Sequence, residues 1–513
     1  MMAHNTVLIL DFGSQYTQLI ARSIRNLGVY CEIHPYNLDD TSILKLKPQA
    51  IILSGSPASL TQENPPRPTD LIWDMRVPIM GICYGMQLVT DHFGGEVSHS
   101  DHKEYGFAVL DICAEDAIVE GLNNQEQVWM SHGDSITLLS DSMRVIARTT
   151  NSPYAIIRHN ELPVYGLQFH PEVVHSPCGD RLLGNFLLKI AGLVADWSAS
   201  SFIEESIAKI KTLIGTEKVI LGLSGGVDSS VAAALLAKAI GDQLIPIFID
   251  NGLMRYREAE RVRESFADLK EIKINFVDAS ELFVGRLSGV TDPETKRKII
   301  GKTFIEVFEQ EAKKYQDANW LAQGTLYPDV IESVSFKGPS ATIKSHHNVG
   351  GLPEKMKLKL IEPLRELFKD EVREVGARLG LPRDLVNRHP FPGPGLGVRI
   401  LSNITKDKIN LLQRVDEVFI SELRASGLYD STWQAFAVLL PVRSVGVMGD
   451  ERSYDYVCAL RAVNSVDGMT ADWTELPFDF LKRVSGRICN EVRGINRVVY
   501  DISSKPPSTI EWE

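Results

Sequence analysis

The chain has 513 residues, enough for several domains that each bury a hydrophobic core. Hydrophobic residues make up 44% and charged residues 23% of the chain, which excludes a largely disordered protein and a fibrous one. The 66 acidic and 54 basic residues give a net charge of −12, so broad binding of nucleic acid or of an anionic membrane is disfavoured. Any phosphate binding must therefore depend on a local site.

The six cysteines are spread along the chain, with no Cys-x-x-Cys pair and no close cluster for a metal. This spacing indicates a reducing compartment rather than a disulfide framework. The longest apolar run, Ala435 to Val442, falls far below the roughly 18 residues that a membrane-spanning helix needs. Val7 to Leu10 are too few for the core of a signal peptide. We therefore expect a cytoplasmic protein that has no membrane segment.

The first third of the chain alternates short apolar strands with amphipathic helices. Val7 to Leu10 and Tyr30 to Ile33 are predicted strands, and apolar residues recur between them at helical spacing. Ala50 to Leu53 and Ile79 to Ile82 are candidates for buried strands, and each runs into a glycine turn. This order predicts an open parallel sheet whose functional loops lie at the carboxyl ends of the strands.

Two breaks divide the rest of the chain. The segment from Gly192 to Ser201 consists mainly of residues with small or polar side chains. A second series of strands and helices begins at Lys218. His389 to Arg399 reads HPFPGPGLGVR, which cannot continue a helix or a central strand. We therefore predict three domains, over residues 1–198, 199–388 and 389–513. The first two are expected to be α/β domains with open parallel sheets, and the last a small α+β domain.

A cysteine stands between two glycines at the end of the fourth predicted strand, in Gly81-Ile82-Cys83-Tyr84-Gly85. This pattern predicts a strained strand-to-helix turn that presents a nucleophile at the edge of the sheet. The N–H group of Tyr84, together with one from the turn around Gly55, is expected to stabilise a thiolate and a developing oxyanion. The chemistry indicated is acyl transfer by Cys83.

A base for this thiol follows another strand, Val164 to Phe169, which ends in His170-Pro171-Glu172. His170 is placed to accept the proton of Cys83, and Glu172 to hold the imidazole. Taken singly, a cysteine is usually a packing residue and a His-Pro pair is usually part of a turn. Because the glycine turns and the histidine fall on one predicted sheet edge, we favour a catalytic triad of Cys83, His170 and Glu172.

The strings GICYGMQ and FHPE resemble the class I, triad-type glutamine amidotransferases, over roughly residues 6–195. The resemblance implies that Cys83 attacks the side-chain amide of glutamine, forms a glutamyl thioester and releases ammonia. A non-enzymatic alternative is a domain that has kept this fold only to bind a partner. The presence of all three triad residues argues against that alternative.

A second motif follows the predicted strand Lys218 to Leu223 and reads Ser224-Gly225-Gly226-Val227-Asp228-Ser229-Ser230. Glycines, hydroxyl groups and the start of the next helix suit the phosphates of ATP. The loop lacks the Gly-Lys-Ser/Thr ending of a Walker A motif. A carboxylate among phosphates needs a cation, so Asp228 is predicted to contact Mg²⁺ that accompanies ATP. The alternative, a Ser/Gly linker, is disfavoured by the flanking strand and helix.

The SGGxDS string resembles the ATP pyrophosphatases, which cleave ATP between the α and β phosphates and leave an adenylylated intermediate. Joined to a glutaminase, such a domain predicts amidation of an oxygen that has first been adenylylated. Essentially the whole chain resembles the glutamine-hydrolysing GMP synthetase family, on the supporting strings KRKIIG, QGTLYPDVIES, IKSHHNVGGLP, HPFPGPGLGVR and KPPSTIEWE. The resemblance implies that ATP adenylylates O2 of xanthosine 5′-monophosphate (XMP) and that ammonia then displaces AMP to give GMP.

The same resemblance places the family's site residues on this sequence. Its adenylylation site matches Asp329, Glu332 and Lys344. Its XMP-binding positions match Arg297, Gln434, Asp450, Arg452, Lys505, Ile510 and Glu511. From their chemistry, Lys505 would neutralise a phosphate and Glu511 would accept a hydrogen bond from a ribose or a purine. Without the resemblance, a proline-rich tail would equally fit a frayed chain end.

A basic segment from Lys337 to Lys359 contains five lysines, and its one acid is Glu354. We expect this segment to be a lid over phosphates. A solvated strand face is the alternative for the three lysines that alternate, Lys355, Lys357 and Lys359. A metal site at His346-His347 is disfavoured because adjacent histidines diverge.

The partners expected from these patterns are small molecules: glutamine, ATP and XMP. The resemblance further implies a homodimer formed through the last domain. A rival is an ATP pyrophosphatase that modifies tRNA. The net charge of −12 and the lack of a broad basic stripe argue against that rival.

Overall fold

The computed structural model describes residues 5–269, 271–334, 358–448, 451–465 and 470–513. The chain forms two compact units. The first contains Met1–Glu205 and Tyr327–Ile343, and the second contains Ser206–Leu326 and Lys344–Glu513. Every helix in the described part of the chain is too short or too polar to cross a membrane.

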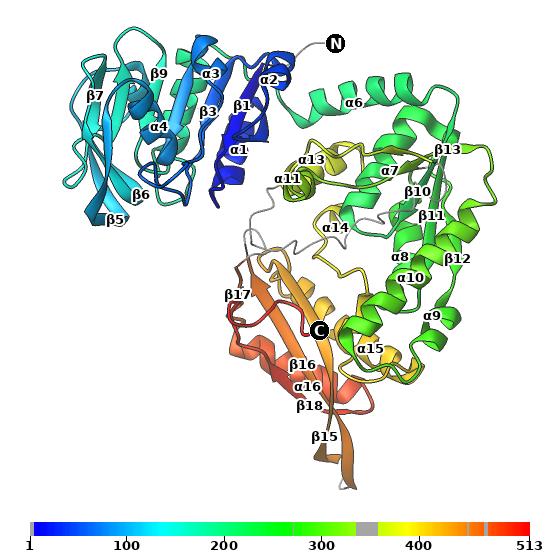
Figure 1. Cartoon of the computed structure of the whole chain (residues 1–513). Helices are drawn as coiled ribbons and strands as arrows, with labels where there is room; N and C mark the ends of the chain where they lie inside the picture. Colours follow the sequence, from blue (N-terminus) through cyan, green and yellow to red (C-terminus); the bar gives the residue numbers. More distant parts are fainter. Residues whose placement is uncertain (1–4, 270, 335–357, 449–450, 466–469) are drawn as a thin grey trace. The chain divides into compact units, whose positions relative to one another are not determined.

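A nine-stranded sheet lies at the centre of the first unit (Figure 1), in the order β2-β1-β3-β4-β9-β8-β7-β5-β6. Its first five strands are parallel. They are β2 (Tyr30–Pro35), β1 (Thr6–Asp11), β3 (Ala50–Leu53), β4 (Ile79–Ile82) and β9 (Val164–Leu167). The residues of β3, β4 and β9 are all buried, as expected where helices cover both faces of a parallel sheet. The predicted parallel α/β fold is confirmed for these strands.

Four antiparallel strands extend this sheet, and the sequence analysis did not predict them. They are β8 (Ile156–His159), β7 (Met143–Arg148), β5 (Glu96–Ile112) and β6 (Gln125–Leu138). Buried and less buried residues alternate along most of β6, the pattern of an antiparallel strand with one covered face. The sheet is therefore mixed, with its parallel half at β1 to β4 and β9.

The first unit also contains helices, most of which connect or follow the parallel strands, whereas η1 lies between the antiparallel strands β5 and β6. These helices are α1 (Thr17–Asn26), α2 (Asp40–Leu46), α3 (Leu71–Asp74), α4 (Tyr84–His92), η1 (Ala117–Val119), α5 (Gly179–Gly184), η2 (Asn185–Ile190) and α11 (Tyr327–Val334). Helix α1 buries Ile20, Ala21 and Ile24, which confirms the helical spacing read from the sequence. The next helix, α6 (Ala199–Ile214), runs from the first unit into the second.

The second unit contains a five-stranded parallel sheet in the order β12-β11-β10-β13-β14. Its strands are β12 (Asn275–Asp278), β11 (Leu244–Asp250), β10 (Lys218–Leu223), β13 (Ala318–Ala322) and β14 (Lys359–Ile361). Its helices are α7 (Val227–Ile240), η3 (Gly241–Gln243), α8 (Glu258–Ser265), α9 (Ser280–Arg286), α10 (Pro293–Ala312), α13 (Lys369–Arg378) and α14 (Arg383–Val386). Both the parallel sheet and its alternation with helices agree with the prediction.

Lys359 lies on β14, exposed, with its ammonium 3.4 Å from Glu217. For this lysine the structure therefore favours a strand face over a lid. The rest of the predicted lid, which includes His346-His347, lies at 337–357, outside the described residues.

The last part of the second unit is an α+β fold, as predicted. Strands β15 (Gln434–Met448) and β16 (Glu451–Asn464) form a long antiparallel hairpin, which β17 (Asp472–Trp473) and β18 (Ile495–Tyr500) extend. The proline-rich segment leads into the short helix η4 (Gly395–Val398), and α15 (Lys406–Ala425) and α16 (Phe478–Glu491) complete this part. All six cysteines of the chain are free thiols.

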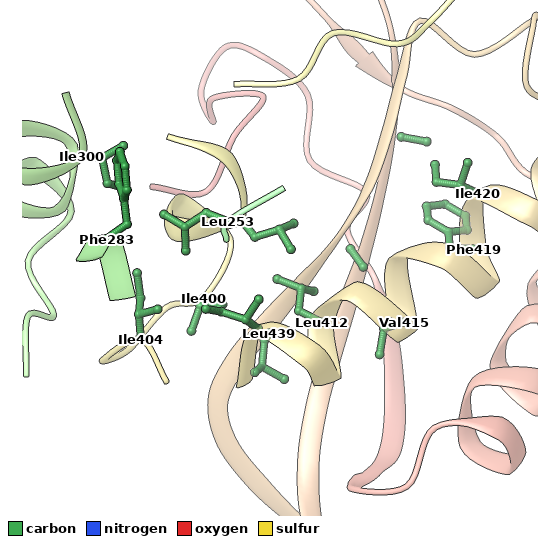
Figure 2. Close-up of a cluster of buried hydrophobic side chains, with 14 of the residues drawn as sticks. Leu253, Phe283, Ile300, Ile400, Ile404, Leu412, Val415, Phe419, Ile420 and Leu439 are labelled. Atoms are coloured by element: carbon green, nitrogen blue, oxygen red, sulfur yellow. The ribbon is translucent and has the colours of Figure 1, made fainter. Parts of the chain in front are cut away.

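One hydrophobic cluster joins this α+β part to the five-stranded sheet and its helices (Figure 2). Leu253, Phe283 and Ile300 come from the sheet region, and Leu412 and Phe419 come from α15. All five side chains are at most 4% exposed. Because the two parts share this core, they form a single compact unit although their strand arrangements differ.

We predict that Phe283→Ala lowers the free energy of unfolding of the second unit by about 3–5 kcal/mol, because a fully buried aromatic ring leaves a cavity. The matched control is Leu282→Ala on the same helix, where the side chain is 40% exposed. Its cost should stay below about 1 kcal/mol. Urea unfolding followed by circular dichroism measures both. Equal destabilisation by the two substitutions would contradict the packing described.

Candidate active sites

Cys83 lies between β4 and α4 with a φ of 53° and a ψ of −105°, in a region that L-residues rarely adopt. The flanking glycines make this turn possible. A Cβ on Gly81 would lie 2.3 Å from the backbone of Gly85, and a Cβ on Gly85 would lie 2.2 Å from the carbonyl oxygen of Leu53. The N–H of Cys83 donates to the carbonyl of Leu167 at 2.7 Å. The cysteine is therefore held in a tightly packed elbow.

His170 connects this thiol to a carboxylate. Its Nδ1 lies 2.7 Å from Oε1 of Glu172, and both side chains are buried. The ring borders the same cavity as Cys83, whose thiol lies 3.6 Å from the carbonyl oxygen of Ser131. Burial alone would lower the pKa of His170, but the negative charge of Glu172 and the interaction with Cys83 together raise it well above its ordinary value. The imidazole is therefore suited to hold the proton of the thiol.

The two residues predicted to stabilise an oxyanion border this pair. A Cβ on Gly55 would lie 3.3 Å from Cε1 of His170, so the turn after β3 lies against the imidazole. Tyr84 opens α4, and the N–H groups of a first helical turn have no partner within the helix. The ring of Tyr84 points elsewhere, since its hydroxyl donates to the carbonyl of Pro66 at 2.8 Å. Tyr84 therefore offers its backbone rather than its side chain.

A cavity of about 580 Å³ opens onto Cys83 and His170. This volume lies within the range of small-molecule sites. Its wall includes Gln87, His132 and Asp134, which the sequence analysis did not identify. His132 is buried, with Nε2 3.3 Å from Glu104 and Nδ1 3.0 Å from the carbonyl oxygen of Asp134. His132 and Asp134 lie on the antiparallel strand β6, and Gln87 lies on α4, the helix after Cys83. None of the three belongs to a sequence motif that would have indicated a role in the site.

The phosphate loop lies between β10 and α7. Ser224 Oγ is 3.0 Å from Ser229 Oγ, and the N–H of Gly226 donates to Ser224 Oγ at 3.2 Å. Gly225 has a φ of +76°, and a Cβ there would lie 2.9 Å from the side chain of Val262. Gly226 caps α7, whose first turn contains Val227, Asp228, Ser229 and Ser230. The loop therefore combines backbone N–H groups, hydroxyls and a helix N-terminus.

Two cations that the sequence analysis missed contact this loop. Lys369, at the start of α13, lies with its ammonium 2.5 Å from the Asp228 carboxylate. Arg388 donates to the carbonyl of Gly225 at 2.9 Å and forms an ion pair with the buried Glu258. Neither belongs to a motif, because long-range packing brings each of them to the loop. The described residues contain no group of three or more potential metal-binding His, Cys, Asp or Glu side chains.

The predicted adenylylation residues are only partly described. Asp329 is exposed in the first turn of α11, a helix that packs with the first unit. Tyr327 begins this helix and is buried, and its hydroxyl accepts a hydrogen bond from the N–H of Ile33. Glu332 lies on α11, but its side chain is not described, and Lys344 lies outside the described residues.

Four of the predicted XMP-binding residues lie around the C-terminal segment. Arg297 on α10 donates to the main-chain oxygen of Glu513. Gln434 donates to Glu511 at 2.9 Å, and the carbonyl of Ile510 accepts from Arg461 at 2.9 Å. The structure therefore brings the tail to α10 and to the start of β15.

Of the other three XMP-binding predictions, one lies on the tail itself, one lies far from it and one is not described. Lys505 pairs through its backbone with Ala471. Arg452 is exposed on β16 opposite Val447, thirteen residues along β15 from Gln434. At about 3.3 Å per residue this separation is roughly 40 Å, so Arg452 does not reach the tail of its own chain. Asp450 lies outside the described residues.

Comparison with known proteins finds family models that match three segments of the chain. The glutamine amidotransferase class-I family model matches residues 8–190, the NAD synthase model 198–283 and the GMP synthase C-terminal domain model 421–512. A protein of Rhizobium rhizogenes named GMP synthase (glutamine-hydrolyzing) is 57% identical over 513 residues, which are 99% of each chain. The chain belongs to the glutamine-hydrolysing GMP synthase family. Relatives of the same name from Phenylobacterium zucineum and Bradyrhizobium diazoefficiens are also 57% identical, over 99% and 94% of their lengths and 99% and 100% of this chain.

Membership of the GMP synthase family confirms the overall resemblance read from the sequence. The family models cover both segments that carry the elbow cysteine and the phosphate loop. The roles of the elbow and loop residues are predictions supported by their geometry, and those of the adenylylation and XMP-binding residues are predictions that rest on the resemblance.

We predict that Glu172→Gln slows the alkylation of Cys83 by iodoacetamide at pH 7 by about tenfold or more. Loss of the Glu172 charge should lower the pKa of His170, so the imidazole holds the thiol proton less well. Mass spectrometry of time points gives the rate. The exposed thiol of Cys113 is an internal reference whose rate should not change. An unchanged Cys83 rate would refute the coupling of the three side chains.

Proposed function

We propose that this chain is a carbon–nitrogen ligase that converts XMP to GMP, with glutamine as the amido donor and ATP as the activating substrate. The observation that carries this proposal is the presence of two kinds of site in one polypeptide. One is a thiol that shares a cavity with an imidazole bound to a buried carboxylate, and the other is a Ser/Gly loop at the start of α7. The first suits release of ammonia from an amide, and the second suits an ATP polyphosphate.

In the first unit, the sulfur of Cys83 attacks the side-chain amide carbon of glutamine while His170 takes the thiol proton. The backbone N–H groups at Tyr84 and Gly55 stabilise the negative oxygen that forms. His170 then returns the proton to the leaving nitrogen, and ammonia departs. Water, activated by the same imidazole, hydrolyses the thioester to glutamate. Glu172 keeps the ring oriented through both steps.

In the second unit, the loop from Ser224 to Ser230 binds the phosphates of ATP. Mg²⁺ is commonly held by one or two carboxylates together with substrate phosphates, and Asp228 beside this loop fits that donor set. The ion would neutralise charge on the phosphates during loss of pyrophosphate. Lys369 pairs with Asp228 in the structure, so its ammonium is within reach of a bound phosphate as well.

The acceptor nucleotide is proposed to lie near the tail. Arg297 and Lys505 supply positive charge for its phosphate, and Gln434, Ile510 and Glu511 supply polar backbone and side-chain groups. Asp329, Glu332 and Lys344 serve the adenylylation step. O2 of XMP attacks the α-phosphate of ATP, pyrophosphate leaves, and ammonia displaces AMP from C2 of the purine.

We further propose that the chain acts as a homodimer through the β15–β16 hairpin. Val445 and Val447 are 46% and 77% exposed on β15, and Tyr454, opposite Val445, is 62% exposed. An exposed apolar strip of this kind is typical of a protein–protein interface. Arg452 lies on the same hairpin and does not reach its own tail, so its proposed contact with XMP requires the tail of a second copy.

The function is tested by a product assay. We expect the purified chain, supplied with glutamine, MgATP and XMP, to form GMP and AMP in a one-to-one ratio, because each amidation consumes one adenylylated oxygen. Separation of nucleotides by ion-exchange chromatography measures both. Formation of ADP in place of AMP, or of AMP without GMP, would contradict the proposed reaction.

The two-site arrangement makes a separate prediction. Cys83→Ala should reduce glutamine-dependent GMP formation by at least about a thousandfold, because the nucleophile is lost. Synthesis from added ammonium should persist, because the second unit is intact. Cys113→Ala, which removes an exposed thiol of the same unit, is the matched control and should retain both activities. Equal loss with glutamine and with ammonium would contradict the separation of the sites.

A further inference from the structure

The C-terminal segment, residues 501–513, contains no helix and no regular strand, yet it is held by buried charge. In the described part of the chain, three basic side chains are 0% exposed: Lys296, Arg399 and Arg461. All three bind this segment. A buried cation without an anionic or carbonyl partner costs several kcal/mol, so these contacts fix the position of the segment.

Two of the three cations hold the middle of the segment. Arg461 on β16 donates to the carbonyl oxygens of Ser503, Thr509 and Ile510 at 2.9–3.0 Å. Arg399, just after η4, forms two hydrogen bonds with the carboxylate of Glu511 at 3.0 and 2.8 Å. A forked pair of this kind fixes the plane of the carboxylate as well as its distance.

The third cation holds the segment against α10. The ammonium of Lys296 lies 2.6 Å from Oε2 of Glu513 and 2.7 Å from the carbonyl of Ile400. The Glu513 side chain is 9% exposed, so the pair is shielded from water. The next residue on α10, Arg297, donates to the main-chain oxygen of Glu513. Two adjacent residues of one helix therefore bind one residue of the tail.

We propose that Lys296 and Glu513 form a clasp that positions both sides of the nucleotide site. This inference rests on the proposed function, in which Arg297 and Glu511 contact XMP. Arg297 follows Lys296 directly, and Glu511 lies two residues before Glu513. The ion pair therefore fixes the separation between an arginine on α10 and a carboxylate on the tail. Lys296 and Glu513 are positioning residues, because they act on XMP through these neighbours.

A clasp and a purely stabilising ion pair lead to different kinetics. Loss of stability lowers the amount of active protein, which reduces kcat and leaves the KM of each substrate unchanged. Loss of positioning weakens the binding of one substrate and leaves the others unaffected. XMP should therefore be affected selectively, while ATP, bound at the loop from Ser224 to Ser230, should not.

The test uses the full chain and ammonium-dependent synthesis, with XMP varied at saturating MgATP. We expect Glu513→Gln and Lys296→Met each to raise the KM for XMP by about tenfold, because a small displacement of Arg297 and Glu511 weakens their contacts. The KM for ATP and the kcat at saturating XMP should stay close to those of the unchanged chain. Lys296→Arg, which keeps the charge, should restore most of the affinity for XMP.

Two further variants distinguish a failure of the clasp from a failure of the proposed nucleotide site. Lys298→Met is the matched control, because Lys298 lies on the same helix with a 75% exposed side chain, and its KM values should not change. Arg297→Met tests the nucleotide site itself and should raise the KM for XMP. An unchanged KM in Arg297→Met would refute the proposed site. A raised KM in Arg297→Met with an unchanged KM in both Lys296→Met and Glu513→Gln would refute the clasp alone. A fall in kcat at unchanged KM for XMP would also refute it.

Discussion

A buried charge must be paired, and this requirement shapes each of the candidate sites. Removing an ion from water costs several kcal/mol after relaxation, and only a close partner with further hydrogen bonds offsets the loss. The described pairs His170–Glu172, Arg388–Glu258 and Arg399–Glu511 each have at least one fully or nearly fully buried side chain. Each pair also contains a proposed functional residue or contacts the backbone of one. Because breaking one of these buried ion pairs would cost several kcal/mol, the pairs hold the groups needed for chemistry in place in addition to packing.

Local backbone constraints explain why two of the sites could be predicted from the sequence. The elbow at Cys83 requires residues without a side chain at Gly81 and Gly85, where a Cβ would lie within 2.3 Å of other backbone atoms. The phosphate loop requires Gly225, with its positive φ. Such requirements act within a few residues of the chain and leave a visible pattern. The strand that precedes each turn is also short and apolar, so the parallel half of the first sheet and the strand β10 before the phosphate loop could be predicted.

The residues that the sequence did not reveal depend on long-range partners. Lys369 and Arg388 reach the phosphate loop from segments far along the chain, and an isolated lysine or arginine carries no sign of its partner. The antiparallel strands β5 to β8 were missed for a related reason, because polarity does not follow burial along β5 and β6. Tyr105 and Phe107 on β5 are 65% and 62% exposed, whereas the polar His132 and Asp134 on β6 are buried. His132 and Asp134, which line the cavity, belong to these strands. The register of a hairpin brings such residues to a site, and register is a property of the pair of strands rather than of either one.

The pairing of cations with the protein's own carboxylates bears on how an acidic chain selects a nucleotide. Lys369 is paired with Asp228 and Arg399 with Glu511, so neither cation is free of a carboxylate in the structure. A cation that binds Asp228 would release Lys369 for the phosphates, which makes the positive charge at the loop depend on that cation. Arg399 has no such exchange available, because its side chain is 0% exposed and both of its bonds to Glu511 lie in a shielded environment. The two ion pairs therefore differ in kind: the first can open for a ligand, and the second keeps the carboxylate of Glu511 fixed as an acceptor. In a chain with a net charge of −12, positive charge for a phosphate is therefore confined to such local sites.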